Sequence, residues 1–465
     1  SEGIVRVETS SPFSSFPKEK VNRSKITDLI RFNKKLYASN SYGLYYFDSR
    51  SSSFKMIEGV NSNGNNFISS NNSLLAATTN EIFRIKDTSA DKIFEFVNPN
   101  LYKSEIDTNI VYVLYRRGLA ILKHENGELN LLKKIAGFDE EVIDLIEDKD
   151  GSLWIQTFYE GVIHLSAKKT LFYTVNDERL EIKKYDEKSG LPGALHKIFK
   201  ADDEILFATD EGLFRFDDRS EKFLSDSSFT AFIAGSSNLI LEAARNENDE
   251  FWILAETKEG TELGKAVKNE TGKYSWKPDP VFRRLNLTSA LMLKADKDPG
   301  TEKEILWITI DEGLVRYSPP VQDLRGQFNV LIRSVKLKND SLVFAGFENP
   351  AHKETALVLP FKNNDIDFSF AALSFDKPAG NKYQYFLEGE DDEWSNWTSE
   401  TGKGYTNLSA GNYTFRLRAK NIYGDLSKEA AFNFEVLSPW YLSWWAYPLY
   451  ALIVLGALFQ IRHYE

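Results

Sequence analysis

Acidic side chains recur at one position of a repeated pattern in this chain of 465 residues. The pattern is a short apolar segment, a polar turn and a second apolar segment that opens with glycine. Glu160 stands in one such turn, Asp210 and Glu211 in a second, and Asp311 and Glu312 in a third. A ligand rich in hydroxyl groups, such as a sugar, needs hydrogen-bond acceptors of this kind and aromatic faces to stack on.

Repeated units that stack around an axis place their equivalent turns on one face. The acids, with an arginine and two tyrosines from equivalent turns, are therefore expected to ring one end of a central channel. The ligand-binding residues predicted in this way are Tyr42, Arg117, Tyr159, Glu160, Asp210 and Asp311.

Two simpler interpretations of these acids stay open. Acidic residues favour turns, so duplication of the unit alone repeats them. Two carboxylates on one face also suit glycoside hydrolysis, but nothing sets one pair apart from the others. No catalytic residue is therefore predicted.

Metal and cofactor chemistry has little support in the sequence. The 5 histidines, at 124, 164, 196, 352 and 463, lack metal-ligand spacing, and the chain has 0 cysteines for disulfides or thiolate sites. Residues Asp148 to Gly151 resemble the start of a calcium loop, but Tyr159 stands where that loop needs glutamate. We expect a turn there, with a cation site as the alternative, and predict neither cofactor nor metal.

Composition excludes some classes of protein. With 42% hydrophobic and 14% aromatic residues the chain is globular. Its net charge of −11 argues against an extended nucleic-acid surface, which needs clustered Lys and Arg.

The elements that must position the turns are about seven copies of a pair of short strands, spaced roughly 40 to 50 residues apart. The first strand of the pair is most apolar at residues 36–38, 75–77, 111–113, 153–155, 206–209, 251–254 and 306–309. The copy at 251–254 is degraded and is followed by what reads as a long charged insertion. Such self-similarity, with four short strands per unit, predicts a seven-bladed β-propeller.

Two interpretations remain for Gly3-Ile4-Val5-Arg6-Val7, which echoes the strand that opens with Gly313. It pairs with the last unit and closes the ring, or it is the end of a unit that this chain lacks. We expect closure. Residues 8–20 are rich in Ser and Pro and are expected to form a loop.

Beyond Pro319 and Pro320 the pattern changes to alternation with period two over residues 328–437. Strand signals at regular spacing over this length predict an antiparallel, immunoglobulin-like β-sandwich.

The segment Trp440 to Ile461 carries no charged residue and is long enough, at about 1.5 Å per residue, to cross a hydrocarbon core of about 30 Å. Aromatic residues crowd its start, and Arg462 and His463 follow its end. We expect a transmembrane helix with a cytoplasmic C-terminus and everything before Trp440 outside. A buried helix of a soluble protein is the alternative.

Two motifs resemble a known family. Gly190-Leu191-Pro192, then Leu206 to Thr209, then Gly212-Leu213-Phe214-Arg215 resembles the propeller repeat of bacterial two-component regulators. The spacing of aromatic residues and glycines from Tyr383 to Gly424 resembles the triple-tyrosine module. In that family the module follows the regulator propeller and directly precedes a membrane helix.

The resemblance implies an all-β sensor region of a hybrid two-component regulator of Bacteroidetes type. It comprises a propeller at residues 1–320, a triple-tyrosine sandwich at 321–437, and a transmembrane helix with the start of a cytoplasmic segment at 438–465. It further implies sensing of an oligosaccharide or another small molecule in the periplasm, anchorage in the inner membrane through Trp440–Ile461, and a cytoplasmic histidine kinase or DNA-binding output beyond Glu465. Because a single helix cannot signal by deforming alone, we expect a homodimer through the sandwich.

Alternatives to this function remain open. The propeller could be a scaffold that docks another envelope protein, or an enzyme acting on glycans. If a first propeller is missing, the ligand site could lie outside this chain. In the sandwich, Tyr385, Trp394, Tyr405 and Tyr413 are expected in the core, with a self-association surface as the alternative.

Overall fold

The computed structural model describes residues 11–464 except 18–23, 137, 139–140, 159–160, 168–171, 175–178, 234, 320–326, 339, 347–356 and 443. The described residues form two compact units, one within Glu8–Val321 and one within Gln322–Glu465. Nearly all of the regular structure is β-strand, as predicted.

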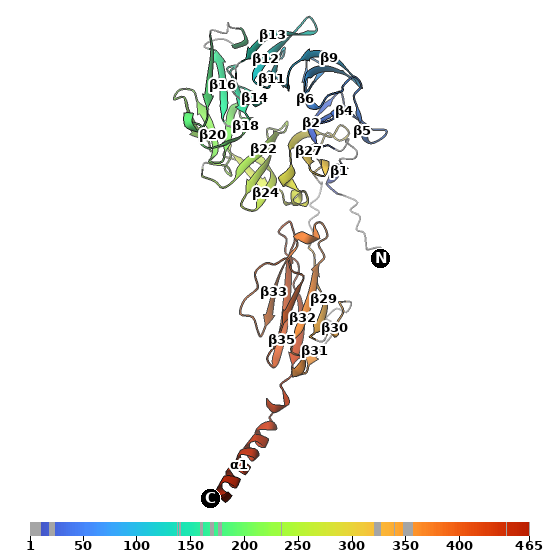
Figure 1. Cartoon of the computed structure of the whole chain (residues 1–465), viewed down its shortest axis with the longest axis vertical. Helices are drawn as coiled ribbons and strands as arrows, with labels where there is room; N and C mark the ends of the chain where they lie inside the picture. The colour runs from blue at the N-terminus through green and yellow to red at the C-terminus, as the bar shows by residue number, and fades with distance from the viewer. Residues whose placement is uncertain are drawn as a thin grey trace. The chain divides into compact units, whose positions relative to one another are not determined.

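Seven four-stranded antiparallel sheets make up the described part of the first unit (Figure 1). Sheets one to three contain β2 (Ile26–Phe32), β3 (Lys35–Asn40), β4 (Gly43–Asp48), β5 (Ser53–Met56); β6 (Gly64–Ser70), β7 (Ser73–Thr78), β8 (Glu81–Lys86), β9 (Ser89–Glu95); and β10 (Asn100–Lys103), β11 (Ile110–Tyr115), β12 (Gly118–Glu125), β13 (Glu128–Ala136). Sheets four and five contain β14 (Val142–Glu147), β15 (Leu153–Thr157), β16 (Val162–Ala167), β17 (Leu180–Tyr185); and β18 (Leu195–Ala201), β19 (Glu204–Thr209), β20 (Gly212–Asp217), β21 (Lys222–Ser225). Sheets six and seven contain β22 (Leu239–Arg245), β23 (Phe251–Thr257), β24 (Gly260–Lys268), β25 (Tyr274–Pro278); and β26 (Met292–Lys297), β27 (Glu304–Ile310), β28 (Gly313–Tyr317), β1 (Phe13–Pro17).

The predicted apolar segments are the second strands of these sheets. β15 and β19 are buried along most of their length because a neighbouring sheet covers each face. The first strands β2, β6 and β10 contact one another in turn, β14, β18, β22 and β26 follow, and β26 contacts β2. This circular order, with apolar clusters shared by neighbouring sheets, is typical of a β-propeller.

The sixth sheet differs from the prediction at one point. The charged residues after Leu254 are not an insertion: β23 and β24 continue as one long hairpin that turns between Thr257 and Gly260. The sequence suggested an insertion because the ends of these two strands carry charged residues and extend beyond the apolar part of the sheet.

Strand β1, which Figure 1 labels near β27, completes the seventh sheet by pairing with β28. Phe13 lies opposite Tyr317 and Phe16 opposite Leu314. The expectation of a loop over residues 8–20 is therefore wrong for β1, and the expected closing strand at Gly3–Val7 lies outside the described residues. The Ser- and Pro-rich composition suggested a loop, but β1 is an edge strand, and an edge strand tolerates a proline such as Pro17 at its end. Its two phenylalanines pack into different clusters, Phe13 beside Phe282 and Phe16 beside Trp307.

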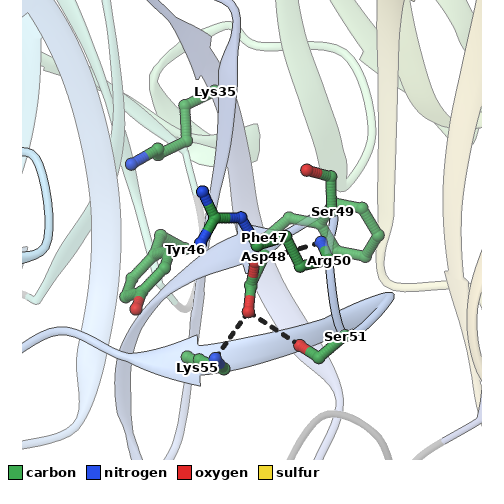
Figure 2. A pocket seen from close by; sticks show the side chains of 8 residues that line it. All are labelled: Lys35, Tyr46, Phe47, Asp48, Ser49, Arg50, Ser51 and Lys55. Carbon is green, nitrogen blue, oxygen red and sulfur yellow. Dashed lines mark hydrogen bonds and ion pairs between the residues drawn. The ribbon is translucent and has the colours of Figure 1, made fainter.

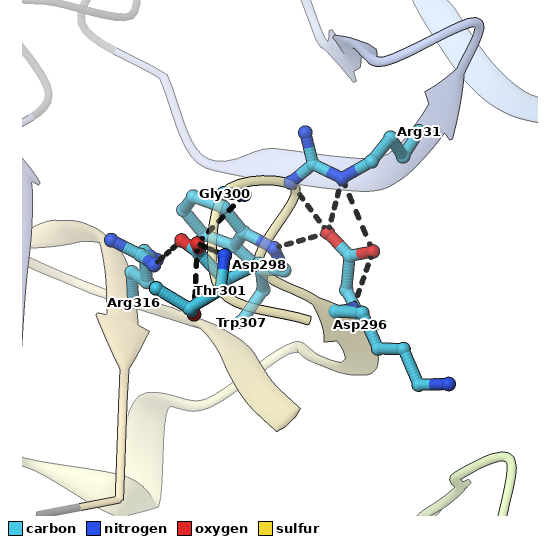
Figure 3. Close-up of polar contacts among 8 residues, drawn as sticks. Arg31, Asp296, Asp298, Gly300, Thr301, Trp307 and Arg316 are labelled. Atoms are coloured by element: carbon cyan, nitrogen blue, oxygen red, sulfur yellow. Dashed lines mark hydrogen bonds and ion pairs between the residues drawn. The ribbon is translucent and has the colours of Figure 1, made fainter. Parts of the chain in front are cut away.

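A polar joint connects the first and seventh sheets (Figure 3). The Arg31 guanidinium donates to the Asp296 carboxylate through Nε and Nη2 at 3.0 and 2.7 Å, and Trp307 Nε1 donates to the same carboxylate at 3.1 Å. Arg31 and Asp296 are only 20% and 16% exposed. In the same view Asp298 pairs with Arg316 and accepts hydrogen bonds from the turn at Gly300 and Thr301.

Two four-stranded sheets form the second unit. One has the order β30 (Leu342–Phe344), β29 (Val330–Leu337), β32 (Ile366–Ala372), β34 (Gly402–Tyr405), and the other β31 (Leu357–Leu359), β36 (Ala430–Val436), β35 (Gly411–Lys420), β33 (Lys382–Glu388). Their inner faces share one apolar cluster. Phe415 lies at its centre, fully buried and stacked on Phe368 at a centroid distance of 3.9 Å.

The aromatic residues predicted for this core divide into two groups. Tyr405 and Tyr413 are buried, and their hydroxyls donate to Asp391 Oδ2 at 2.8 Å and to the Ser409 carbonyl at 2.9 Å. Tyr385 is half-buried, and half-buried Trp394 lies 4.3 Å from the Arg418 guanidinium. Core packing thus describes the first group better than the second.

The C-terminal segment holds a 3₁₀ turn, η10 (Trp440–Leu442), and one helix, α1 (Ala446–Tyr464). The helix starts six residues later than the predicted Trp440 because Pro448 is tolerated only in a first helical turn. In the described part of the chain, no helix combines the length and the apolar character needed to cross a membrane. The predicted transmembrane helix is thus not confirmed.

Candidate functional site: the polar channel of the seven-sheet unit

Four of the six predicted ligand-binding residues lie in the turn between the second and third strands of their sheet. Tyr42 joins β3 to β4, Arg117 joins β11 to β12, Asp210 joins β19 to β20, and Asp311 joins β27 to β28. All four side chains are exposed. Tyr159 and Glu160 lie outside the described residues.

Two of these residues contact the segment that leads into a first strand. Asp210 Oδ1 accepts a hydrogen bond from the Ala194 amide at 2.8 Å, and Asp311 Oδ1 lies 2.5 Å from Lys25 Nζ. Gly193, next to Ala194, has a φ of +71° and leaves no room for a Cβ beside Asp210. Both acids therefore have a local structural role, and ligand binding by the predicted ring stays a prediction.

The first strands carry a second set of polar residues, which face the channel. In β2, β14, β18 and β22 the pairing with the second strand is interrupted directly before a charged residue. A β-bulge of this kind turns a side chain that regular pairing would direct elsewhere. The residues that follow the four bulges are Asp28, Asp144, Lys197 and Glu242.

Lys197 lies between two of these acids. Its Nζ is 3.3 Å from Asp144 Oδ2 and 3.1 Å from Glu242 Oε1, so one cation joins sheets four, five and six. All three side chains are 22–27% exposed. Burial by itself lowers the pKa of Lys197, but the charges and hydrogen bonds of Asp144 and Glu242 outweigh it and raise the pKa, so the ammonium stays charged.

On the other side of the channel Asp28 plays a similar part. Its Oδ2 accepts a hydrogen bond from the Phe67 amide of β6 at 2.8 Å, and Lys294 Nζ of β26 lies 3.6 Å from its Oδ1. Asn66 completes the row by exchanging two hydrogen bonds with the backbone of Leu101, at 2.8 and 2.9 Å. These contacts fix the order of the first strands around the channel.

A cavity of about 660 Å³ opens between these strands, at the end of the sheets where the predicted turns lie. Its polar walls are formed by Thr27, Asp28, Asn65, Asn66, Asn98, Asn100, Tyr102, Lys103, Asp144, Lys197 and Lys294. Tyr102 donates to the Ile143 carbonyl at 3.1 Å, and burial together with the Asp144 charge raises its pKa, so it remains a neutral donor and acceptor. The volume falls within the range of about 300–1,000 Å³ that is typical of small-molecule sites, and the polar walls differ from the mainly apolar lining of most such sites.

This row of residues was not predicted from the sequence. The usable signal was a polar or charged residue near the middle of each first strand, visible in Asp28, Asp144 and Lys197. Regular alternation would direct these side chains away from the channel, and the bulges cannot be read from alternation alone.

His164 lies in β16, the third strand of its sheet, and is not one of the residues that line the cavity. His164 is half-buried and stacks on Trp154 at a centroid distance of 4.1 Å. Burial lowers its pKa despite the nearby carboxylates of Asp150 and Asp148. The Asp148–Gly151 segment is a turn. The Gly151 backbone N–H closes it by donating a hydrogen bond to the Asp148 carbonyl oxygen at 2.9 Å. No cluster of three or more potential metal ligands occurs in the part of the chain that the structure describes.

Comparison with known proteins agrees with the sequence resemblance. The Y_Y_Y domain family matches residues 374–437, within the second unit. A segment of 158 residues is 30% identical to histidine kinase P4 of Formosa agariphila, and the match covers 32% of this chain and 11% of that kinase.

Among solved structures, the fold resembles a crystal structure of the extracellular domain assigned to a hybrid two-component system of B. thetaiotaomicron. The TM-score is 0.60 at 15% sequence identity, over 89% of this chain and 56% of that one. The chain thus spans about half of the solved domain and about a tenth of the kinase. The resemblance to sensor regions of two-component regulators is confirmed.

Proposed function

We propose that the chain is the extracytoplasmic ligand-sensing region of a membrane-bound two-component regulator, and that the channel of the first unit binds a neutral oligosaccharide. The observation that carries the proposal is a cavity of about 660 Å³ whose walls include two ion pairs, Lys197 with Asp144 and Lys294 with Asp28. The Y_Y_Y match and the fold shared with an extracellular domain support the placement outside the cytoplasm.

The balance of charge favours a neutral ligand rich in hydroxyl groups. Lys197 has two acids as partners and Lys294 has Asp28, so a strongly charged ligand would have to displace an existing pair. Carboxylate oxygens, amides of the asparagines and the Tyr102 hydroxyl instead offer acceptors and donors to hydroxyls. We expect the turns between second and third strands that carry Asp210 and Asp311 to add contacts for a longer chain of sugars.

A thermal-unfolding screen of the 465-residue chain in detergent against neutral oligosaccharides tests this proposal. A ligand at 100 times its dissociation constant adds about 2.7 kcal/mol, which raises the melting temperature by a degree or more. Asp144→Asn should abolish the shift, and Asp249→Asn, an exposed acid of the β22–β23 turn, should preserve it. No shift with any glycan would contradict the proposal and favour a scaffold that binds protein.

We also propose that residues 440–464 attach the chain to the inner membrane. In α1 the consecutive residues Leu452, Ile453, Val454 and Leu455 are each 57–66% exposed, so apolar side chains cover the helix on all sides. Such a helix needs an apolar environment. Flotation with lipid vesicles should be lost in Leu455→Asp and retained in Gln460→Asp, and equal flotation of both variants would contradict the attachment.

Signal transmission completes the proposal: two copies associate through the sandwich, and the ligand changes how they are arranged. The output domain would be a histidine kinase, as the match to the Formosa agariphila kinase suggests. Light scattering of the detergent-solubilised chain should give the mass of two copies with or without ligand. A monomer under both conditions would exclude this route.

A further inference from the structure

Figure 2 shows a second hollow, of about 610 Å³. The strand register places it at the end of the first sheet opposite the channel cavity, because Lys35 pairs with Phe32 whereas Asn40 pairs with Ile26. The turn between β4 and β5 forms one wall, and the start of β3 forms another. The residues that line it are Lys35, Tyr46, Phe47, Asp48, Ser49, Arg50, Ser51 and Lys55. None of them belongs to the predicted ring of turn residues or to the row of polar residues on the first strands.

Positive charge is in excess around this hollow. It contains the cations Lys35, Arg50 and Lys55, whereas the acids that meet them are Asp48 and Asp87. This local excess contrasts with the net charge of −11 of the whole chain. In the channel, by comparison, Lys197 has two acidic partners and Lys294 has one.

Asp48 is occupied in holding the turn. Its Oδ2 accepts hydrogen bonds from Lys55 Nζ at 2.5 Å and Ser51 Oγ at 2.9 Å, and its Oδ1 accepts one from the Arg50 amide at 3.1 Å. The Lys55 hydrogen bond is the largest of the effects that lower the pKa of Asp48 to about 2. With 18% exposure against 50% for Lys55, the carboxylate lies beneath the cations.

The guanidinium of Arg50 is left available by this arrangement. Among the described residues none forms a hydrogen bond or an ion pair with it, although the Arg50 backbone is fixed by Asp48. Figure 2 shows the Arg50 and Lys35 side chains reaching toward the ring of Tyr46, and Lys35 Nζ lies 5.1 Å from the centroid of that ring. A planar donor fork, an ammonium group and an aromatic ring thus border one space.

We propose that this hollow binds an oxyanion group, a sulfate, phosphate or carboxylate, on a small polar ligand. Arg50 forms the bidentate contact, because its fork matches two oxygens of such a group. Lys35 and Lys55 add charge from either side, and the Tyr46 ring borders the site. The site is independent of the proposed function, because it shares no residue with the channel.

Titration calorimetry on the detergent-solubilised chain, at constant ionic strength in chloride, tests this site. The probes are inorganic sulfate, inorganic phosphate and glucuronate, with glucose as the neutral comparison. Saturable binding of at least one anion and none of glucose is expected. A preference for glucuronate over both inorganic anions would identify an acidic sugar as the source, and the reverse preference would identify a free anion.

Three substitutions decide which side chain is responsible. Arg50→Gln should weaken binding by about tenfold or more, and Arg50→Lys should lie between it and the unchanged chain because charge remains without the fork. Arg245→Gln, which removes an exposed arginine of another sheet, should bind as the unchanged chain does. Equal binding by Arg50→Gln, or equal loss in Arg245→Gln, would overturn the proposal.

A melting curve of each variant provides the check on folding. Because the Arg50 side chain is exposed and forms no described contact, its substitution should leave the melting temperature without ligand unchanged. Asp144→Asn should retain anion binding, so that a failure of the channel proposal and a failure of this one are distinguishable.

Discussion

The two units of the chain bury their sheets in different ways. The sandwich has one apolar cluster between two sheets, and ion pairs such as Arg416 with Glu388 lie on its surface. The first unit divides its apolar residues among clusters between neighbouring sheets and adds polar joints, such as Arg31 with Asp296, that cross from one sheet to the next. We infer that similar sheets need directional contacts to define their neighbours, whereas two sheets with one core do not.

The largest expected effect concerns the single core. Phe415→Ala should destabilise the sandwich by about 3–5 kcal/mol, because it empties the centre of a cluster that cannot collapse from both sides. The unfolding temperature of the first unit should not change. Scanning calorimetry in the presence of urea would resolve the two unfolding transitions. The control is Phe375→Ala, which should have little effect because Phe375 is 54% exposed. A shift of both transitions would refute independent cores.

A joint between sheets should be next in size. Asp296→Ala leaves the Arg31 guanidinium and the Trp307 indole without their acceptor, at a cost of about 3 kcal/mol for a largely buried pair. Asp249→Ala removes one partner of an exposed pair with Arg245 and should cost less than about 1 kcal/mol. Similar melting temperatures for the two variants would mean that the joints do not stabilise the ring.

The lysine in the channel tests whether the joints act as units. Lys197→Met leaves Asp144 and Glu242 facing each other without a cation and should cost about 1–3 kcal/mol. Adding Glu242→Gln removes one of the two charges and should recover part of that loss. If the two effects simply add in a double-mutant cycle by thermal unfolding, the three side chains do not form a coupled network.

The smallest effect is a dependence on pH. Burial lowers the pKa of His164, so the unfolded chain takes up a proton before the folded chain does, and stability falls as the pH drops below 6.5 toward the folded pKa. His164→Phe keeps a ring against Trp154 and should flatten this loss in the first unit. His124, whose pKa is also lowered by burial, would retain part of it. Melting temperatures at pH 7.5 and 5.5 are the measurement, with exposed His196→Gln as the control, and an unchanged slope in His164→Phe would exclude the assignment.

Strand positions were predictable where burial is symmetrical. Second strands such as β19 are covered on both faces, so their apolar runs stand out in the sequence, and the turns after them carry Asp and Gly for local reasons. The mainly β fold follows from that pattern. Strand β1 was not predicted. Its two apolar residues, Phe13 and Phe16, lie on different faces, so its hydrophobic pattern is too short to distinguish an edge strand from a loop.

The functional surfaces were less predictable, for a physical reason. The turn acids Asp210 and Asp311 were visible as repeated residues, but their contacts to Ala194 and Lys25 depend on neighbouring sheets. The channel row depends on bulges, and the hollow at Arg50 depends on how a turn folds back over its own sheet. Both are properties of backbone geometry that residue periodicity does not encode.

The pairing of β1 with β28 has a topological consequence. The seventh sheet is built from two stretches of chain that are about 300 residues apart in sequence, so the two ends of the first unit meet within one sheet. Which sheet is divided in this way depends on where the chain is opened, and not on the contacts between strands. A circular permutant of the first unit alone, opened in the exposed turn at Arg219 and Ser220 and with a linker that joins the end of β28 to the start of β1, would make the seventh sheet continuous and the fifth sheet the divided one, while every strand of that unit kept its present partners.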